Sequence, residues 1–223
     1  MKPKPDFRQE QHWLNAYPNG IVIGLDEAGR GPWAGPVMAG AAWISPDAVN
    51  DLPAGIADSK TLSEGSRKQI YRQLKDMAED HTKLKLATAA VSAAEIDDIG
   101  ILPATFRAMQ MAADKLTLTH GRDYAVLLVD GSITPDLTTE AEHTHVEAVV
   151  KGDGHVLSIA VAAIMAKYDR DQEMMALAQE YPNYQWQNNK GYGTADHKSA
   201  LDTYGVTPYH RKSFRPVARL LEE

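Results

Sequence analysis

The stretch that decides the fold is IVIGLDEAGRGPWAGPV, which runs from Ile21 to Val37. It begins with apolar residues that do not alternate with polar ones, a pattern typical of a β-strand buried on both faces. The strand is expected to end at Asp26 and Glu27, two adjacent carboxylates that repel each other and lose solvation. A cation between them would offset that cost, so the pair predicts a site for a hard metal ion.

A glycine-rich turn follows the two carboxylates. Gly29 and Gly31 let the backbone approach a ligand closely, and the Arg30 guanidinium between them suits a phosphate group. The turn is not the dinucleotide-binding fingerprint, because Pro32 and Pro36 stand where that motif needs a helix. The sequence also lacks a Walker phosphate loop and a Gly-x-Ser-x-Gly elbow, so nucleoside triphosphatase and serine hydrolase functions lack their motifs.

The composition is that of an ordinary globular protein with an acidic balance. The 223 residues suffice for one well-buried core, and 43% hydrophobic and 24% charged residues are typical of soluble chains. A net charge of −7 argues against a protein that coats nucleic acid generally, which would be basic. We expect no signal peptide and no membrane span, and therefore a cytoplasmic protein, which we take to be a monomer. The absence of cysteine excludes disulfides, thiolate metal sites and cysteine nucleophiles.

Further apolar runs predict the remaining strands. They cover residues 36–44, 84–92, 124–129 and 145–150. Helices are expected over residues 61–79, 101–116 and 156–166, the first opened by a capping box from Thr61 to Glu64. Residues 1–20 are expected to be a loose lead-in in which Trp13 and Leu14 dock on the body. Strands interleaved with helices along the chain indicate an α/β fold.

Three of the apolar runs are followed by carboxylates. Asp26 and Glu27 follow the first run, Asp130 follows the fourth, and Asp153 follows the fifth. Taken singly, Asp130 and Asp153 are ordinary turn starters. Carboxylates at the ends of neighbouring strands in an open α/β sheet, however, mark the crevice where such folds bind ligands. Oxygen ligands without cysteine or a histidine cluster favour Mg²⁺ or Mn²⁺ over zinc.

The histidines offer a competing metal site. His143 and His145 would share one face of a strand, a spacing that some zinc sites use, but the sequence supplies no obvious partners. His155, His197 and His210 are scattered along the chain. A zinc or acid-base site built on histidine is therefore less well supported than the carboxylate site.

The sequence resembles the type 2 ribonucleases H (ribonuclease HII), enzymes that cut the RNA strand of RNA/DNA duplexes. The resemblance is carried by DEAGRG at 26–31, DSK at 58–60, KGD at 151–153, KGY at 190–192 and HRKSF at 210–214. These segments occur in the family's order over nearly the whole chain. Asn189 and Gly193 depart from the pattern, because a histidine and a proline are common there, and this puts the rigidity of that loop in doubt.

The resemblance implies a ribonuclease H-like mixed sheet flanked by helices, with a small helical C-terminal extension. Three antiparallel strands come first, and later strands are added through helical crossovers. The chain is then divided into an N-terminal lead-in (1–20), a catalytic domain (21–180) and a C-terminal helical substrate-binding part packed on the core (181–223).

The expected chemistry is metal-dependent phosphodiester hydrolysis. Asp26, Glu27, Asp130 and Asp153 would hold two Mg²⁺ or Mn²⁺ ions, with no need for a side-chain nucleophile. The resemblance further implies cleavage on the 5′ side of ribonucleotides, including single ones embedded in duplex DNA, which leaves 5′-phosphate and 3′-hydroxyl ends. Such a reaction belongs to the removal of ribonucleotides from DNA.

The resemblance also implies a substrate-binding set. Gly29, Arg30 and Gly31 would surround the 2′-hydroxyl that separates RNA from DNA, and Tyr192 would pack against the neighbouring sugar. Lys60 would contact the substrate backbone. Taken alone, Lys60 is a solvated lysine beside a helix cap, and Tyr192 is an ordinary loop aromatic.

Other features leave alternatives open. The basic residues between Lys190 and Arg219 suit either a phosphate contact or a solvated helical surface. Arg170 and Asp171 are expected to pair on a helix surface or to support the site from behind. Two other functions also stay open, a non-catalytic module that binds hybrids and a different metal-dependent nuclease or phosphotransferase on a similar fold.

Overall fold

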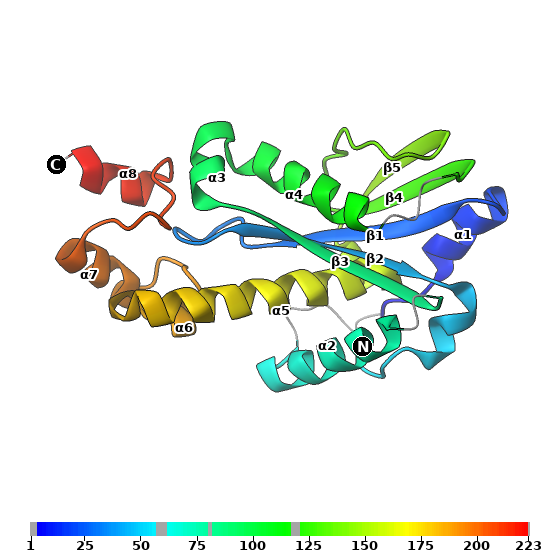
Figure 1. The fold of residues 1–223 in the computed structure, drawn as a ribbon, viewed down its shortest axis with the longest axis horizontal. Helices are drawn as coiled ribbons and strands as arrows, with labels where there is room; N and C mark the ends of the chain where they lie inside the picture. The colour runs from blue at the N-terminus through cyan, green and yellow to red at the C-terminus, as the bar shows by residue number, and fades with distance from the viewer. Residues whose placement is uncertain (1–3, 57–61, 80–81, 117–120, 223) are drawn as a thin grey trace.

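The computed structural model describes residues 4–56, 62–79, 82–116 and 121–222 (Figure 1). Within these residues the centre is one mixed sheet, made of β1 (Ile21–Ala28), β2 (Val37–Ile44), β3 (Leu84–Val91), β4 (Tyr124–Asp130) and β5 (His143–Val149). The strand order is β3-β2-β1-β4-β5. The first three strands are antiparallel neighbours, whereas β4 runs parallel to β1 and β5 parallel to β4. The expected mixed sheet is confirmed.

Helices cover both faces of the sheet (Figure 1). They are α1 (Arg8–Ala16), α2 (Glu64–Ala78), α3 (Ala93–Ile99), α4 (Ile101–Lys115), α5 (Leu157–Glu180), α6 (Trp186–Asn189), α7 (Ala195–Tyr204) and α8 (Arg215–Glu222). Helices α3 and α4 lie on one face, α5 and α2 lie on the other, and α7 and α8 extend beyond one end. No helix among the described residues is long and apolar enough to cross a membrane.

The start of α2 differs from the expected capping box. Ser63 is the N-cap, and its hydroxyl accepts the Ser66 N–H at 3.1 Å. Thr61, the expected cap, lies outside the described residues. Helix α3, which the sequence analysis did not predict, does carry a complete capping box between Ser92 and Glu95.

The two connections that lead to the parallel strands differ. The path from β3 to β4 runs through α3 and α4, as expected for a helical crossover. The path from β4 to β5 contains no helix, so the expectation of a helical crossover is wrong there. Instead of a helix, this connection has Leu137 buried in the core. The Gln110 side chain of α4 makes two hydrogen bonds with the backbone of Thr138 in the same connection. These bonds satisfy backbone groups that a helix would otherwise satisfy internally.

Strand β1 does not end before its carboxylates. It pairs with β2 up to Ala28, and this pairing includes Asp26 opposite Gly40 and Glu27 opposite Ala39. Its parallel pairing with β4 stops earlier, at Leu25. Both carboxylates therefore sit on a rigid strand at the point where its bonds to β4 have ended.

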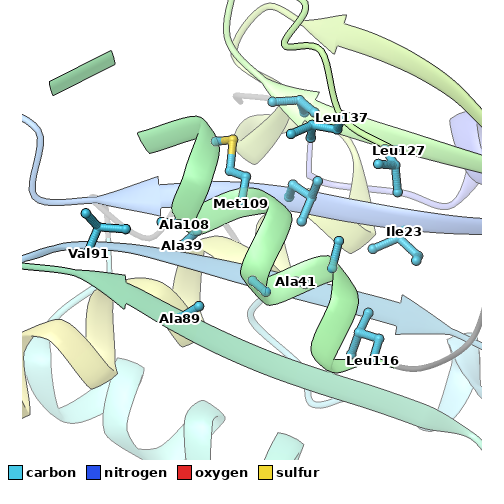
Figure 2. Packing of buried hydrophobic residues seen from close by; sticks show 14 of the residues in the cluster. Ile23, Ala39, Ala41, Ala89, Val91, Ala108, Met109, Leu116, Leu127 and Leu137 are labelled. Atoms are coloured by element: carbon cyan, nitrogen blue, oxygen red, sulfur yellow. The ribbon is translucent and has the colours of Figure 1, made fainter. Parts of the chain in front are cut away.

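The largest hydrophobic cluster lies between α4 and the sheet (Figure 2). Met109 of α4 and Leu116, the C-cap residue of that helix, pack with Ile23 of β1 and Leu127 of β4. Burying each such side chain contributes about 1.5–3 kcal/mol. On the opposite face α5 lies directly against β1, because a Cβ added at Gly24 would meet the Ser158 backbone at 2.3 Å. This contact fixes the helix that follows Asp153 against the strand that carries Asp26.

The N-terminal segment is not a loose lead-in. Residues 8–16 form α1, and Trp13 and Leu14 pack against the core, as expected for those two side chains. The indole N–H of Trp13 donates to Glu147 Oε2 at 2.8 Å. Few apolar residues mark this helix in the sequence, because tertiary contacts rather than an apolar stripe hold it in place.

Glu10 links α1 to the first turn of α5. Its side chain is 1% exposed, and its Oε1 accepts the Ser158 N–H at 2.7 Å. The N-cap of α5, Val156, offers no side-chain hydrogen bond of its own. Burial raises the pKa of the Glu10 carboxyl, whereas the bond from Ser158 opposes the rise. Glu10 thus acts as a helix cap supplied from another helix.

We predict that Glu10→Ala lowers the free energy of unfolding by about 1–2 kcal/mol, because the first turn of α5 loses its acceptor. Urea unfolding monitored by circular dichroism measures the change. The exposed neighbour Gln11 provides the matched control, and Gln11→Ala should change stability by less than about 0.5 kcal/mol. Equal effects of the two substitutions would contradict the capping role.

Candidate active site

The carboxylates singled out in the sequence lie at the carboxyl ends of neighbouring strands. Leu25 of β1 pairs with Val129 of β4, and the next residues along the two strands are Asp26 and Asp130. The parallel register therefore puts these two aspartates at the same level of the sheet. Asp153 follows β5, in a short 3₁₀ turn over Gly152–Gly154.

Asp26 is buried among other carboxylates, so a negative charge on Asp26 is unfavourable. Asp26 is 5% exposed and Asp153 is 6% exposed. Desolvation raises the pKa of Asp26 well above its usual range, and the negative charges of Glu27, Asp130 and Asp153 raise it further. The Glu27 N–H, which donates to Asp26 Oδ1 at 2.6 Å, opposes the rise only in part. The charges of the other three carboxylates therefore act on Asp26.

The donor set fits a hard divalent cation. Asp130 Oδ1 is buried and has no hydrogen-bond partner among the described residues, so it is available to a ligand. All the candidate ligands are carboxylate oxygens, which suit Mg²⁺ or Mn²⁺. No three His, Cys, Asp or Glu side chains within the described ranges already stand in the arrangement of a metal site. Mutual repulsion between carboxylates opposes such an arrangement when no cation neutralises them.

Arg211 holds the glycine-rich turn through hydrogen bonds to its backbone. It is fully buried, and its guanidinium donates to the carbonyl oxygens of Gly29 at 2.6 Å, Arg30 at 3.0 Å and Gly35 at 3.0 Å. Desolvation and the nearby charge of Arg170 lower the pKa of Arg211 to about 9. Arg211 was expected, with the other basic residues between Lys190 and Arg219, to contact phosphate or to lie on a solvated helical surface, and its full burial contradicts the solvated surface.

Arg170 holds the same turn from α5. The expectation that it pairs on a helix surface is wrong, because it is 1% exposed. Its guanidinium donates to the carbonyl oxygens of Ala34, Pro36 and Lys190. Asp171 pairs with Lys167 at 2.6 Å and with Arg67 at 3.6 Å. Burial lowers the pKa of Arg170 as well.

The glycine-rich turn faces the loop that carries Tyr192. A Cβ added at Gly31 would lie 3.6 Å from Tyr192 Cε1, and the tyrosine is 47% exposed. Arg30 is half exposed and contacts Glu27 Oε1 at 3.4 Å. The structure therefore brings Gly31, Arg30 and Tyr192 close to one another beside the carboxylates, whereas Lys60 lies outside the described residues.

Hydrogen bonds of the Asn189 side chain stabilise the loop whose rigidity the sequence put in doubt. Its amide Nδ2 donates to the Tyr184 carbonyl at 2.8 Å, and its Oδ1 accepts the Gly191 N–H at 2.8 Å. A Cβ added at Gly193 would meet the Trp33 ring at 2.0 Å, so the loop lies directly on that indole. The two departures from the family pattern are therefore accommodated by local contacts.

Within the described part of the chain, the histidines do not form a metal-binding cluster. His145 packs on Trp13, with ring centroids 4.5 Å apart, and His143 is exposed. His197 and His210, far from scattered, contact each other through their Nε2 atoms at 3.0 Å. Nothing in the sequence signals this pairing, because the two residues belong to different segments that meet only in the folded chain.

Basic residues of the C-terminal part gather around one groove. Its lining includes Lys198, Arg215 and Arg219, with Trp33 at its wall and Asp202 as the acidic residue. Trp33 belongs to the segment that follows the glycine-rich turn. The groove therefore adjoins the candidate site and carries the positive charge that phosphate groups favour.

A mixed sheet with carboxylates at the ends of its central strands, beside a glycine-rich turn, defines a nuclease of the ribonuclease H fold. Residues 23–217 match the ribonuclease HII family. The ribonuclease HII of Acidovorax sp. strain JS42 is 44% identical over 213 residues, which are 96% of this chain and 94% of that protein. That of Jannaschia sp. strain CCS1 is 44% identical over 220 residues, 97% and 98% of the two chains.

Solved structures agree with these relatives. Ribonuclease H2 from Pyrococcus horikoshii OT3 superposes with a TM-score of 0.68 and 26% identity, over 90% of this chain and 97% of that one. Bst ribonuclease HIII, solved in complex with Mn²⁺, has a TM-score of 0.70 and 17% identity, over 92% and 70%, and supports the fold alone.

The chain belongs to the ribonuclease HII family. It is a hydrolase, an endonuclease that cleaves the RNA of RNA/DNA hybrids. The family depends on divalent metal ions, a requirement that the carboxylate donor set fits.

We predict that Asp26→Asn raises the melting temperature in metal-free buffer at pH 7, by about 2–4 °C. The folded protein raises the pKa of Asp26, so the stability linked to this group is fully present below its unfolded pKa and is lost as pH rises through the folded pKa. Asparagine removes the charge and keeps an oxygen for the Glu27 N–H. Thermal melts with EDTA at pH 5 and pH 8 should show the larger gain at pH 8.

The exposed carboxylate Asp136 supplies the control for this prediction. Asp136→Asn should leave the melting temperature within about 1 °C of the wild type at both pH values. A lower melting temperature for Asp26→Asn at both pH values would contradict the account of repulsion at Asp26.

Proposed function

We propose that this enzyme cuts duplex DNA on the 5′ side of embedded ribonucleotides, in addition to cleaving hybrids, and leaves 5′-phosphate and 3′-hydroxyl ends. It would act as a cytoplasmic monomer in the removal of ribonucleotides from DNA. The observation that carries the proposal is the buried Asp26 carboxylate, which feels the charges of Glu27, Asp130 and Asp153 at the end of the central strands.

In this proposal Asp26, Glu27, Asp130 and Asp153 are the catalytic residues and hold two Mg²⁺ or Mn²⁺ ions. Such a pair, when bound, activates the attacking water and stabilises the leaving 3′ oxygen. The carboxylate-only donor set and the absence of cysteine support these ions over zinc.

In the reaction, the protein would hold the carboxylates that bind the metal ions in fixed positions. The Glu27 N–H fixes one oxygen of Asp26 at 2.6 Å. Asp130 contributes a buried oxygen that its protein neighbours leave unsatisfied. Because the negative charges of the four carboxylates repel one another, a cation is bound more favourably here than at an isolated carboxylate.

Substrate binding is assigned to the face beside the carboxylates. Gly29, Arg30 and Gly31 would surround the 2′-hydroxyl, and Tyr192 would pack against the adjoining deoxyribose. The short approach between Gly31 and the Tyr192 ring supports this arrangement. Lys60 would contact the substrate backbone. Residues 21–180 would then carry the chemistry and residues 181–223 would hold the substrate, with residues 1–20 as an N-terminal segment that precedes the catalytic part.

The decisive assay uses a labelled DNA duplex that contains one ribonucleotide. With Mg²⁺ or Mn²⁺ we expect a single cut just 5′ of the ribonucleotide, and with EDTA no cut. An all-DNA duplex should stay intact, and Asp26→Asn should lower the rate by at least about a thousandfold. Products with 3′-hydroxyl ends, shown by extension with a DNA polymerase, complete the assignment.

One outcome would overturn the proposal in favour of the non-catalytic alternative. If folded protein binds the hybrid and the ribonucleotide duplex but cuts neither with Mg²⁺ or Mn²⁺, the carboxylates are structural. Cleavage of the hybrid but not of the duplex with one ribonucleotide would remove only the finer specificity.

We predict that Tyr192→Ala lowers kcat/KM at a single ribonucleotide by about tenfold, and on long hybrids by less than about threefold. A single ribonucleotide presents one RNA–DNA junction, whereas a hybrid offers many alternative sites. Tyr204, an exposed tyrosine on α7, is the control, and Tyr204→Ala should change neither rate. Equal losses on both substrates would show that Tyr192 does not read the junction.

A further inference from the structure

Tyr192 lies between two glycines that the structure requires for close packing. Gly191 has φ +84°, and a Cβ added there would meet the Ala34 carbonyl oxygen at 2.4 Å. A Cβ added at Gly193 would meet the Trp33 ring. Glycine permits these approaches but leaves the backbone with the greatest freedom of any residue. Within the loop, the Tyr192 N–H donates to the Asn189 carbonyl at 2.9 Å, and the Tyr192 carbonyl accepts the Thr194 N–H at 2.8 Å. A contact from outside the loop adds a further restraint on the Tyr192 carbonyl.

A directed chain of hydrogen bonds reaches the Tyr192 carbonyl from the C-terminal part. The Thr207 N–H donates to His210 Nδ1 at 3.0 Å, so the His210 proton resides on Nε2. His210 Nε2–H then donates to His197 Nε2 at 3.0 Å. With that nitrogen accepting, the His197 proton resides on Nδ1 and is donated to the Tyr192 oxygen at 3.0 Å.

A second donor agrees with this assignment of protons. The indole N–H of Trp186 can only donate, and it points at His197 Nε2 at 3.2 Å. His197 Nε2 must therefore be unprotonated. One tautomer of each ring is compatible with all four contacts, with the Trp186 and His210 donors sharing the single lone pair of His197 Nε2.

Burial keeps both rings neutral, which the chain of bonds requires. His197 is 0% exposed and His210 is 1% exposed. Desolvation, and then the neighbouring His197, lower the pKa of His210 to about 3, and desolvation lowers the pKa of His197. A proton added to His197 Nε2 would face the His210 N–H across their 3.0 Å contact, and a proton added to His210 Nδ1 would face the Thr207 N–H across 3.0 Å.

We propose that His197, held by His210, is a positioning residue that adds a side-chain donor to the Thr194 N–H at the Tyr192 carbonyl and thereby keeps the phenol ring beside Gly31. It would thus set the preference for single embedded ribonucleotides over long hybrids. This inference rests on the proposed function, because it assigns a cause to the selectivity of Tyr192. His197 itself touches neither the substrate nor the reacting atoms.

Two substitutions at His197 separate this role from simple packing. In His197→Asn the amide N–H lies near the position of Nδ1 and can still donate to the Tyr192 carbonyl. In His197→Gln the amide lies one bond further out, near Nε2, and that donor is lost. The exposed His12 serves as the control, as His12→Gln.

The measurement is kcat/KM on the duplex with one ribonucleotide and on a long hybrid. We expect His197→Gln to lose about tenfold on the first substrate and less than about threefold on the second, whereas His197→Asn stays within about threefold of the wild type on both. Because His197 acts through Tyr192, His197→Gln should cause no further selectivity loss in a Tyr192→Ala background. Equal losses on both substrates, or additive losses in the double variant, overturn the proposal.

A measurement on the wild type covers the case in which His197→Gln does not fold. Nitrogen-15 NMR of labelled histidine reports which ring nitrogen carries the proton. The proposal requires an Nδ1–H tautomer for His197 and an Nε2–H tautomer for His210 at pH 7, and any other pair overturns it. If the wild type cuts neither substrate, the proposed function fails, whereas the tautomers remain a separate test of the hydrogen-bond chain.

Discussion

The burial of the Asp26 carboxyl among three other carboxyl groups is the constraint on which the rest of the structure depends. A carboxylate that is 5% exposed, and that feels three further carboxylates, tends to push the surrounding elements apart. The scaffold resists because β1 continues through Asp26 and Glu27 in full pairing with β2. Helix α5 supports the strand from behind, through its close contact at Gly24. The repulsion among these carboxylates lowers the stability of the fold, as is common at functional sites.

Positive charge is buried on the other side of the glycine-rich turn. Arg170 and Arg211 each direct three hydrogen bonds to backbone carbonyls, and these bonds join the segments 29–36 and 190–194 to α5 and the HRKSF segment. Guanidinium groups are suited to this task because their donors are fixed in a plane. Two buried cations behind the turn also make its surface more attractive to phosphate groups. The glycine-rich turn thus follows the carboxylates of β1 along the chain and is held by two buried arginines.

Local sequence patterns predicted much of this architecture. Apolar runs located all five strands, and the boundaries at Leu84 and Tyr124 were correct. Strand β4 leaves the stronger signal, because it is buried on both faces. The end of β1 was placed too early. A carboxylate usually ends a buried strand, but here pairing with β2 carries the strand past Asp26. Helix α1 was missed, since its hold on the core comes from Trp13 and Glu10 rather than from an apolar stripe.

The contacts that the sequence could not predict are the long-range ones. Arg211 reaches Gly29 across 182 positions of the chain, and no local pattern announces that bond. His197 and His210 looked unrelated because their pairing depends on how α7 and the following loop fold together. The carboxylates could be predicted as a group only because each follows an apolar run, which puts strand ends at one edge of the sheet.

The most direct test of the central claim is an anomalous difference map from crystals of the wild type grown with Mn²⁺. The account predicts density for bound ions among Asp26, Glu27, Asp130 and Asp153, and its loss in crystals of Asp26→Asn. Mn²⁺ density at His143 or His145, with none at the carboxylates, would contradict it.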